Sequence, residues 1–488
     1  MKYLLGIDFG GGASKATLLS DEGRIVATNT VEYPTHYPQA GFAEQQPEDW
    51  YAATKRTIGA LLAKSGISAS EITAISLDAA THTAVLTDED FHVLRPAIYW
   101  TDSRSVEEVA FLKTDYGAVI EKQVLHQPDT IWTLPQLLWV RKHEPEIWGK
   151  IRRVMFAKDF VRHQLTGDFV TDEIEAQGSM FFDYTTMGWS EELFGLLGLP
   201  KSVLPELVKP YAIAGHVTAA AAADTGLAEG TPVLCGTTDT VMEVFASGAV
   251  SRGQMTIKLA TAGRICVMTE RAYPDRNLIN YSHVVDGLWY PGTATKSCAA
   301  SFRWFRDTFG GDYKELDQQA ADIPVGCDGL MFHPYLNGEL TPYADPRLRG
   351  SFIGIRSGHT KAHFTRAVLE GVALSMLDCK TALENLQIPH EATAVAIGGG
   401  AASRLWRQIL SDALGMTLVV HEHSDSSFGS AMFAGVAAGI FASCEDAVRR
   451  CVKEVSRTVP NAANTAQYAA LFEKYRKVHD VLADVYHA

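Results

Sequence analysis

The sequence lacks the cysteine spacing of a metal or disulfide scaffold. Its 7 cysteines are scattered along 488 residues, and no two of them form a CxxC pair. Zinc modules and disulfide frameworks depend on regular cysteine spacings, so neither organises this fold. Scattered cysteines are typical of buried, reduced thiols, and we therefore expect a cytoplasmic protein.

Two common phosphate-binding motifs are also missing. The chain has no GxxxxGK[ST] loop, and no GxGxxG follows an apolar strand. These motifs serve P-loop proteins and dinucleotide-binding folds, respectively. A nucleotide site in this protein therefore requires another design.

The sequence has fewer basic than acidic residues and no long apolar run. Asp and Glu number 57 against 43 Lys and Arg, which gives a formal net charge of −14. Nucleic acids and anionic membranes are themselves negative, so neither is expected as a partner. The longest apolar stretch, residues 431–442, is too short to span a bilayer. The N-terminus also lacks the pattern of a signal peptide.

What is present is a long α/β pattern with a weak internal repeat. A chain of 488 residues exceeds one ordinary core. An apolar strand, a small-residue turn and a second apolar strand occur in GIDFGGGASKATLL and again in TIKLATAGRICVM. This repeat predicts two related α/β domains, 1–245 and 246–488, that face one another across a central cleft. Residues 106–230, mostly helical by pattern, are expected as an insertion in the first domain.

Several individual elements are predicted as well. Helices are expected over residues 47–64, 364–386 and 468–486, where apolar residues recur at helical spacing. A further helix is expected over LPQLLWVRKHEPEIW, and a hairpin over residues 277–292. The small-residue helix over residues 430–440 fits either the interior of the second domain or a homodimer interface. Both alternatives stay open.

The first glycine-rich turn combines a carboxylate with an anion-binding backbone. Asp8 ends an apolar strand, three glycines (Gly10, Gly11 and Gly12) follow it, and Lys15 stands on the returning strand. Glycines allow several backbone N–H groups to point at one anion. A carboxylate beside a phosphate requires a divalent cation between them. The loop thus fits half of a nucleotide site, and a glycine-rich hairpin with an incidental Asp fits equally.

Two further positions combine polar residues with the end of an apolar strand. Asp239 follows the strand TPVLCGTTD and could accept a proton from a substrate hydroxyl. Capping of the helix that follows is an equally good role for it. Thr81 and His82 lie between two strands, where a neutral imidazole could bind hydroxyl groups. A lone histidine is, however, more often structural.

Trp100, Asp102 and Arg104 place an aromatic face beside an acid and a base. Sugars bind to this combination, and an Asp–Arg pair that fixes a turn is the alternative. A third glycine-rich turn, at Gly399 and Gly400 before Ser403, could lie against a base or ribose. For that turn alone, close strand-to-helix packing is the better interpretation.

In this order, the stretches resemble the FGGY carbohydrate kinases of the actin-like ATPase superfamily, over essentially the whole chain. GSFIGI at 350–355, with HF and AVLEG after it, resembles the C-terminal signature of that family, and TLPQLLW at 133–139 resembles the N-terminal one. The stretches WTDSR, PYLNGELTPYADPRLRG and IGGGAASRLWRQ are most similar to the branch that phosphorylates D-xylulose.

The resemblance implies a fold, an activity and a set of roles. The fold is two actin-like (ribonuclease H-like) ATPase domains, and the reaction is ATP-dependent phosphorylation of the terminal hydroxyl of a ketopentose, with ATP and Mg²⁺ as cofactors. Asp239 is implied as the general base and Asp8 as the acid that holds Mg²⁺ through water. The residues implied to bind the sugar are Thr81, His82, Trp100, Asp102 and Asp239. Those implied to bind ATP are Gly10, Gly11, Gly12, Lys15, Thr261, Gly263, Gly399, Gly400 and Ser403.

Three loops depart from the pattern of the family. Gly11 and Gly12 stand where Thr and Ser are usual, ATAG at 260–263 replaces Gly-Thr-Ser-Gly, and ATHT at 80–83 replaces Gln-Met-His-Gly. The sugar loop leaves the substrate open, and gluconate and ribulose are the other candidates. A gluconate site needs a cation, for which Arg104 is the nearby candidate. The altered phosphate loops also leave open a nucleotide sensor without transferase activity.

Overall fold

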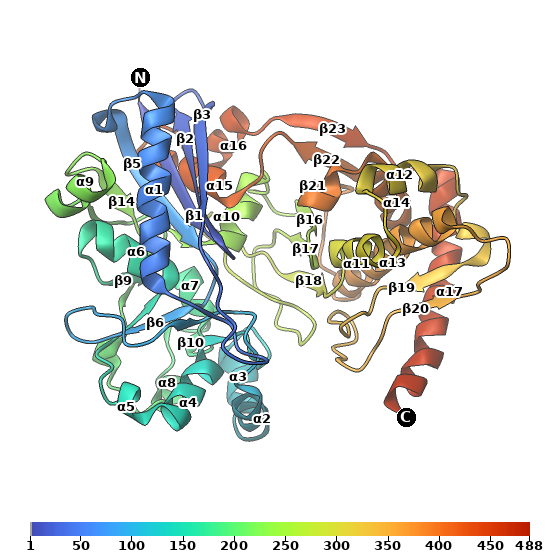
Figure 1. Ribbon diagram of the computed structural model, residues 1–488, viewed down its shortest axis with the longest axis horizontal. Helices are drawn as coiled ribbons and strands as arrows, with labels where there is room; N and C mark the ends of the chain where they lie inside the picture. The colour runs from blue at the N-terminus through green and yellow to red at the C-terminus, as the bar shows by residue number, and fades with distance from the viewer. Residues whose placement is uncertain (1) are drawn as a thin grey trace. The chain divides into compact units, whose positions relative to one another are not determined.

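The computed structural model describes residues 2–488 and divides into two compact α/β units (Figure 1). The first unit extends to Val250 and also contains Tyr281–Gly287 and His423–Val452. The second comprises Ser251–Asn280, Leu288–Glu422 and Lys453–Ala488. The sequence alone predicts a single boundary after residue 245, whereas two later segments return to the first unit.

The first unit contains the following elements: β1 (Tyr3–Phe9), β2 (Ala13–Ser20), β3 (Ile25–Glu32), β4 (Glu44–Gln45), α1 (Pro47–Ser65), β5 (Ile72–Ala79), β6 (Ala84–Thr87), β7 (Ala97–Ile98), α2 (Val106–Asp115), α3 (Gly117–Gln123), α4 (Thr133–His143), α5 (Pro145–Trp148), β8 (Arg153–Phe156), α6 (Ala157–Thr166), β9 (Val170–Asp172), α7 (Glu173–Gln177), β10 (Phe182–Asp183), β11 (Gly188–Trp189), α8 (Glu191–Gly195), β12 (Glu206–Val208), β13 (Ile213–His216), α9 (Ala219–Thr225), β14 (Pro232–Leu234), β15 (Thr237–Thr238), α10 (Asp239–Ala246), α15 (Ser426–Ala437) and α16 (Cys444–Cys451). The elements from α2 to α9 include the predicted helical insertion, with short strands among its helices.

Strand β1 is the centre of the first sheet, whose order is β13-β14-β5-β1-β2-β3. Side chains alternate between the two faces of a strand. Tyr3, Leu5, Ile7 and Phe9 share one core cluster with Trp50 of α1. On the opposite face, a Cβ on Gly6 would lie 2.0 Å from the carbonyl oxygen of Ser427. Gly6 therefore permits α15 to lie directly on the sheet, within the first unit.

The second unit contains the following elements: β16 (Met255–Leu259), β17 (Gly263–Val267), β18 (Gly292–Thr295), α11 (Ala299–Phe309), α12 (Tyr313–Ala321), β19 (Met331–His333), β20 (Ser351–Ile353), α13 (Lys361–Asn385), β21 (Thr393–Ile397), α14 (Arg404–Leu414), β22 (Thr417–His421), β23 (Glu454–Thr458) and α17 (Ala462–His487). Its main sheet has the order β18-β17-β16-β21-β22-β23.

The two main sheets repeat one topology. Hairpin β1–β2 is antiparallel and β1 pairs with β5 in parallel. In the second unit, hairpin β16–β17 is antiparallel and β16 pairs with β21 in parallel. The outer strands β13 and β23 are both antiparallel to their neighbours. The predicted internal repeat is therefore confirmed as a duplicated sheet.

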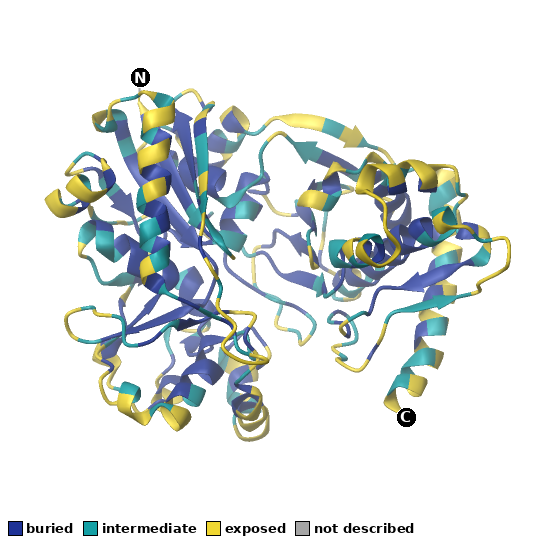
Figure 2. Ribbon diagram, viewed as in Figure 1, coloured by how far each residue is buried: buried dark blue, intermediate teal, exposed yellow. Residues whose placement is uncertain are grey.

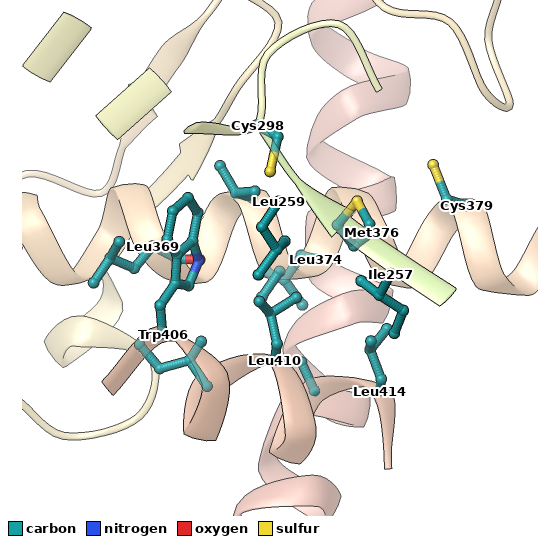
Figure 3. Packing of buried hydrophobic residues seen from close by; sticks show 14 of the residues in the cluster. Ile257, Leu259, Cys298, Leu369, Leu374, Met376, Cys379, Trp406, Leu410 and Leu414 are labelled. Atoms are coloured by element: carbon teal, nitrogen blue, oxygen red, sulfur yellow. The ribbon is translucent and has the colours of Figure 1, made fainter. Parts of the chain in front are cut away.

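The core of the second unit forms between its sheet and the helices α13 and α14. Figure 3 shows Trp406, Leu410 and Leu414 of α14 beside Ile257 and Leu259 of β16 and side chains of α13. The Trp406 indole also donates a hydrogen bond of 3.1 Å to the Leu369 carbonyl. In Figure 2, the central strands of each main sheet are mostly buried, whereas the outer strand β23 and the helices α1 and α12 present exposed residues. This packing holds the turn before α14 in place.

Two predicted elements are wrong. The single helix over LPQLLWVRKHEPEIW breaks into α4 and α5 at Glu144, because the residue before a proline is disfavoured in the α region. The predicted hairpin over residues 277–292 is reduced to isolated bridges, such as Ile279 with Gly292. There, Gln177 of the first unit bonds both the backbone N–H and the hydroxyl of Ser282. The bond to the Ser282 N–H uses a backbone donor that a hairpin would need.

All seven cysteines are buried thiols outside any disulfide, as expected. Every helix within residues 2–488 is too short or too polar to traverse a bilayer.

Candidate active site

Asp8 faces α15 at the carboxyl end of β1. In the parallel pair of β1 and β5, Asp8 stands opposite Asp78, and in the antiparallel hairpin it stands opposite Lys15. Asp78 is fully buried, and one of its oxygens accepts a hydrogen bond from Ser430 of α15. The strand register thus places two carboxyl groups and one ammonium group at one sheet edge.

The two carboxyl groups share a low-dielectric environment. Burial, followed by the charge of Asp239, raises the pKa of Asp8 to about 7, although hydrogen bonds with Asp78 and Ser426 oppose this rise. Burial and the charge of Asp8 also raise the pKa of Asp78 well above its usual range. Two adjacent carboxylates disfavour each other's ionisation, so the pair favours either a shared proton or a bound cation.

Lys15 completes this edge through an ion pair with α15. Its ammonium group lies 3.0 Å from Asp425, and Asp425 is the N-cap of α15, where its side chain accepts a bond from the Phe428 N–H. Burial raises the pKa of Asp425, but Lys15 and the Ser427 hydroxyl outweigh this effect and hold it below its usual value. Lys15 is therefore fixed over the hairpin.

The donors present fit a magnesium ion. Within residues 2–488, no hydrogen-bond partner reaches Oδ1 of Asp8 or Oδ1 of Asp78, and both atoms are buried. No cluster of three metal-ligating side chains forms in the same range of residues. Mg²⁺ is typically held by one or two carboxylates, by water and by substrate phosphates. Asp8, backed by Asp78, meets that requirement.

Asp239 stands one residue beyond β15, which pairs with β5 so that Thr237 lies opposite Asp78. Its Oδ1 accepts a bond of 3.2 Å from the Thr240 hydroxyl and a long one of 3.5 Å from Thr81. Thr238 is the N-cap of α10 and bonds the Val241 N–H. Capping, the alternative role for Asp239, therefore belongs to its neighbour.

The approach of β14 to β5 depends on Gly236. Its φ is +69°, and a Cβ there would lie 1.9 Å from the Leu77 carbonyl oxygen. Only glycine fits so close to another backbone at a positive φ. Gly236 thus sets the path that delivers Asp239 to the sheet edge.

The carbonyl groups at the tip of the first hairpin accept hydrogen bonds from side chains. The Tyr33 hydroxyl donates a bond of 2.6 Å to the Gly10 carbonyl, and the Gln45 amide donates one of 3.0 Å to the Gly11 carbonyl. In a trans peptide, the C=O and the following N–H point in opposite directions. The N–H groups of Gly11 and Gly12 consequently face away from these partners, in position for an anion.

His82 lies beside the acidic site in a constrained turn. Its φ is +54°, its backbone N–H bonds Glu175, and its ring lies 4.8 Å from that of Trp132. Burial lowers the pKa of His82 to about 3, although a hydrogen bond with the Ile131 backbone raises it in part. The ring is neutral, and Nδ1 has no hydrogen-bond partner in the described part of the chain. This nitrogen can accept a bond from a hydroxyl group.

Asp102 and Arg104 form an ion pair that fixes a turn, which is the alternative to a sugar site. The side chains of Asp102 and Arg104 are each 1% exposed, and both oxygens of the carboxylate accept bonds from the guanidinium. Arg104 also pairs with Glu44 and stacks 3.7 Å above the Phe42 ring. Trp100 is 44% exposed. A sugar contact of Trp100 or Asp102 stays a prediction.

The second unit contains a separate cavity of about 1080 Å³, on which Thr261, Gly399, Gly400 and Ser403 meet. Its walls are mainly apolar, with Leu259, Phe302, Tyr313 and Trp406 among them. Ser403 caps α14, and its side chain also bonds the carboxyl group of Asp317. An apolar slot with a few polar groups is typical of a small-ligand site.

Gly263 has a packing role at the second hairpin. A Cβ there would lie 2.7 Å from the sulfur of Met376. The tip residue Thr261 is exposed, and its carbonyl accepts bonds from the backbone of Cys298 and Ala300. The Thr261 carbonyl is thus held by hydrogen bonds, as the Gly10 and Gly11 carbonyls are in the first hairpin.

Sequence reasoning missed Asp78, Asp425 and Tyr33. It also missed Tyr99, whose hydroxyl oxygen would lie 2.8 Å from a Cβ on Gly11 of the first hairpin. The signal for Asp78 is an ionisable residue inside an otherwise apolar strand, ITAISLDAA. The signal for Asp425 is an Asp before Ser-Ser-Phe, a pattern that predicts an N-cap. The tyrosines offer no local signal, because their role depends on contacts with a distant hairpin.

The amino-acid sequence of the chain is similar to those of known proteins. A sequence model of the FGGY family of carbohydrate kinases, N-terminal domain, matches residues 3–246. The corresponding model of the C-terminal domain matches residues 264–438.

Individual relatives cover the whole chain. A xylulose kinase of Bacillus subtilis is 32% identical over 99% of this chain and 98% of its own length. A gluconokinase of the same organism is 28% identical over 99% of this chain and 97% of its own. The crystal structure of xylulose kinase from Rhodospirillum rubrum, 28% identical, superimposes with a TM-score of 0.92 over 100% of both chains.

Proposed function

This chain belongs to the FGGY family of carbohydrate kinases, and from that premise we propose that it phosphorylates the terminal hydroxyl of D-xylulose with ATP. It is a phosphotransferase with an alcohol group as acceptor, and its substrate is a small sugar. The observation that supports the proposal most is the meeting of Asp8, Asp78 and Asp239 at adjoining strand ends. The seven reduced cysteines favour the cytoplasm as the site of the reaction.

In the proposed reaction, the terminal hydroxyl oxygen of the sugar attacks the γ-phosphorus of ATP and ADP leaves. Asp239 accepts the hydroxyl proton as the new O–P bond forms. The amides of Gly11 and Gly12 hold the phosphoryl oxygens, and Lys15 adds positive charge. Asp8, supported by Asp78, would hold Mg²⁺, which neutralises phosphate charge when bound.

The nucleotide is proposed to place its adenosine in the cavity of the second unit. Leu259 and Trp406 offer apolar faces to the base, and Asp317 offers a carboxylate to hydroxyl groups. The close packing favoured for the Gly399–Gly400 turn is consistent with Gly400 only, since a Cβ there would lie 2.9 Å from the Trp406 ring. Apart from the adjacent backbone of its own turn, a Cβ on Gly399 meets no atom of residues 2–488 within 4 Å.

The surroundings of Arg104 favour a neutral ketose over gluconate. A carboxylate substrate needs a cation that can face it, and Arg104 is the nearby candidate. Its guanidinium is 1% exposed and already pairs with Asp102 and Glu44. Gluconate would have to break a buried ion pair, a change that typically costs about 3–5 kcal/mol.

A panel of acceptors tests the substrate. Sugar-stimulated ADP release is measured with D-xylulose, D-ribulose, gluconate and glycerol at saturating MgATP. We expect kcat/KM to be highest for D-xylulose and at least about tenfold lower for gluconate. A preference for gluconate would replace the proposed substrate. ATP binding without ADP release for any acceptor would instead indicate a sensor.

The variant Gly399→Val tests the nucleotide cavity. Its side chain enters open space, so we expect an unchanged melting temperature and KM for ATP raised about tenfold or more, with KM for the sugar unaltered. Gly358→Val is the matched control, since Gly358 is an exposed glycine of the same unit whose Cβ is also unobstructed. Unchanged KM for ATP would place the adenosine elsewhere.

A further inference from the structure

The first hairpin lacks a hydroxyl-bearing side chain at residues 10–12, yet a hydroxyl group lies over it. Tyr99 follows β7, and its backbone N–H bonds the Ala43 carbonyl. A Cβ on Gly11 would lie 2.8 Å from the Tyr99 hydroxyl oxygen. Apart from Gly11 and its two chain neighbours, the only other atom of residues 2–488 within 4 Å of that Cβ is Cζ of the same tyrosine.

This contact explains why residue 11 is glycine. Gly11 does not adopt a left-handed backbone conformation, so its backbone would accept any L-residue. The space that a side chain would fill is instead occupied by the Tyr99 oxygen. Position 11 and Tyr99 are therefore alternative ways to place one polar group at the same point of the hairpin.

The Tyr99 hydroxyl is available as a donor. The side chain of Trp100 hydrogen-bonds to it, and an indole can only donate, so the tyrosine keeps its own proton for another acceptor. Burial, with the charges of Asp239 and Asp8, raises the pKa of Tyr99 to about 12. The group thus stays protonated at neutral pH and lies within the field of both carboxylates.

We propose that the Tyr99 hydroxyl donates a hydrogen bond to the terminal phosphoryl group of the bound nucleotide, in place of a hydroxyl side chain at position 11. This inference rests on the proposed function, because it needs a nucleoside triphosphate at the first hairpin. It makes Tyr99 a direct ligand of the transferring group, and Gly11 the partner residue that leaves room for it.

The first test is Tyr99→Phe, which removes only the oxygen. We expect kcat to fall about 10- to 100-fold, as for the loss of a hydrogen bond to a charged group, with KM for the sugar changed less than about twofold. The control is Tyr184→Phe, since Tyr184 is a half-buried tyrosine of the same unit that belongs to no predicted site. A raised KM for the sugar with unchanged kcat would show that Tyr99 serves the acceptor, and would overturn the inference.

The second test exchanges the two positions. Gly11→Ser alone places its Cβ 2.8 Å from the Tyr99 oxygen and should lower activity. In the Tyr99→Phe background, the same serine has room and restores a hydroxyl. We expect the double variant to exceed both single variants and to recover to within about fivefold of the parent. Additive losses would contradict the exchange.

A binding measurement separates the inference from the proposed function. Titration calorimetry with a non-hydrolysable ATP analogue and with ADP, both with Mg²⁺, needs no turnover. Tyr99→Phe should weaken the analogue about tenfold or more and leave ADP unaffected, because ADP lacks the terminal phosphoryl group. Equal effects on both nucleotides would overturn the inference. Absent ADP release in the parent protein would refute the proposed function alone.

Discussion

Replacing Asp239 with Asn is expected to lower kcat about 1,000-fold while KM for the sugar changes less than about threefold. A positioned general base contributes about 10²- to 10⁴-fold to a proton-transfer step. Asn keeps the shape of the side chain and its contacts with Thr81 and Thr240, but it cannot accept the hydroxyl proton. The measurement is steady-state ADP release with varied sugar.

Stability distinguishes a chemical role for Asp239 from a structural one. Thr238 already caps α10, so Asp239→Asn should leave the melting temperature within about 2 °C of the parent. Glu48→Gln is the matched control, because Glu48 is an acid in the first turn of α1. It shows what the loss of a charge at a helix start does alone. Near-normal turnover in Asp239→Asn would refute the general-base role.

Replacing Asp8 with Asn is expected to remove activity and to stabilise the fold above pH 7. Turnover should fall about 100-fold or more, because a neutral amide holds a divalent cation poorly. Calorimetric titration should also show that Mg²⁺ no longer strengthens the binding of the ATP analogue. This second readout is independent of turnover.

The stability effect follows from the raised pKa of Asp8. The folded-state pKa rises from 3.8 to about 7, so the folded protein binds more protons than the unfolded chain between these pH values. Its free energy of unfolding therefore falls as pH rises through this window. Since one pKa unit corresponds to about 1.4 kcal/mol, the loss is at most about 4 kcal/mol.

Asp8→Asn should remove this dependence, so its melting temperature should exceed that of the parent at pH 8 and approach it at pH 5. The control is Asp90→Asn, since Asp90 is exposed on a loop. If the melting temperature of Asp8→Asn instead fell below that of the parent by the same amount at both pH values, the Asp8 carboxylate would be a structural group.

The position of the candidate active site is predictable from the sequence because polar residues interrupt apolar strands. Asp8 and Asp239 each follow a run of apolar residues that forms a strand of the first sheet. Strand ends are where polar groups reach solvent or ligand, so both carboxylates were recognisable. Their surroundings were not recognisable, since Asp78 belongs to the neighbouring parallel strand and Asp425 lies more than 400 residues beyond Asp8.

The role of Asp102 illustrates the limit of local patterns. Trp100, Asp102 and Arg104 fit a sugar site or a turn equally well in sequence. In the structure, both oxygens of Asp102 accept hydrogen bonds from Arg104, which also pairs with Glu44 from another part of the chain. Asp102 and Glu44 together occupy the Arg104 guanidinium, so this residue is not available as a cation for a substrate.

The plan of two related α/β units, the glycine-rich hairpins and the two carboxylates can be predicted from local patterns, because strand alternation and turn chemistry are local properties. The groups that surround the carboxylates depend on tertiary packing. Asp78 reaches Asp8 through the register of parallel strands, α15 returns to the first sheet over Gly6, and Tyr99 fills the space at Gly11. Each of these contacts joins residues far apart in the chain, and the register and packing that create them have no local sequence signal.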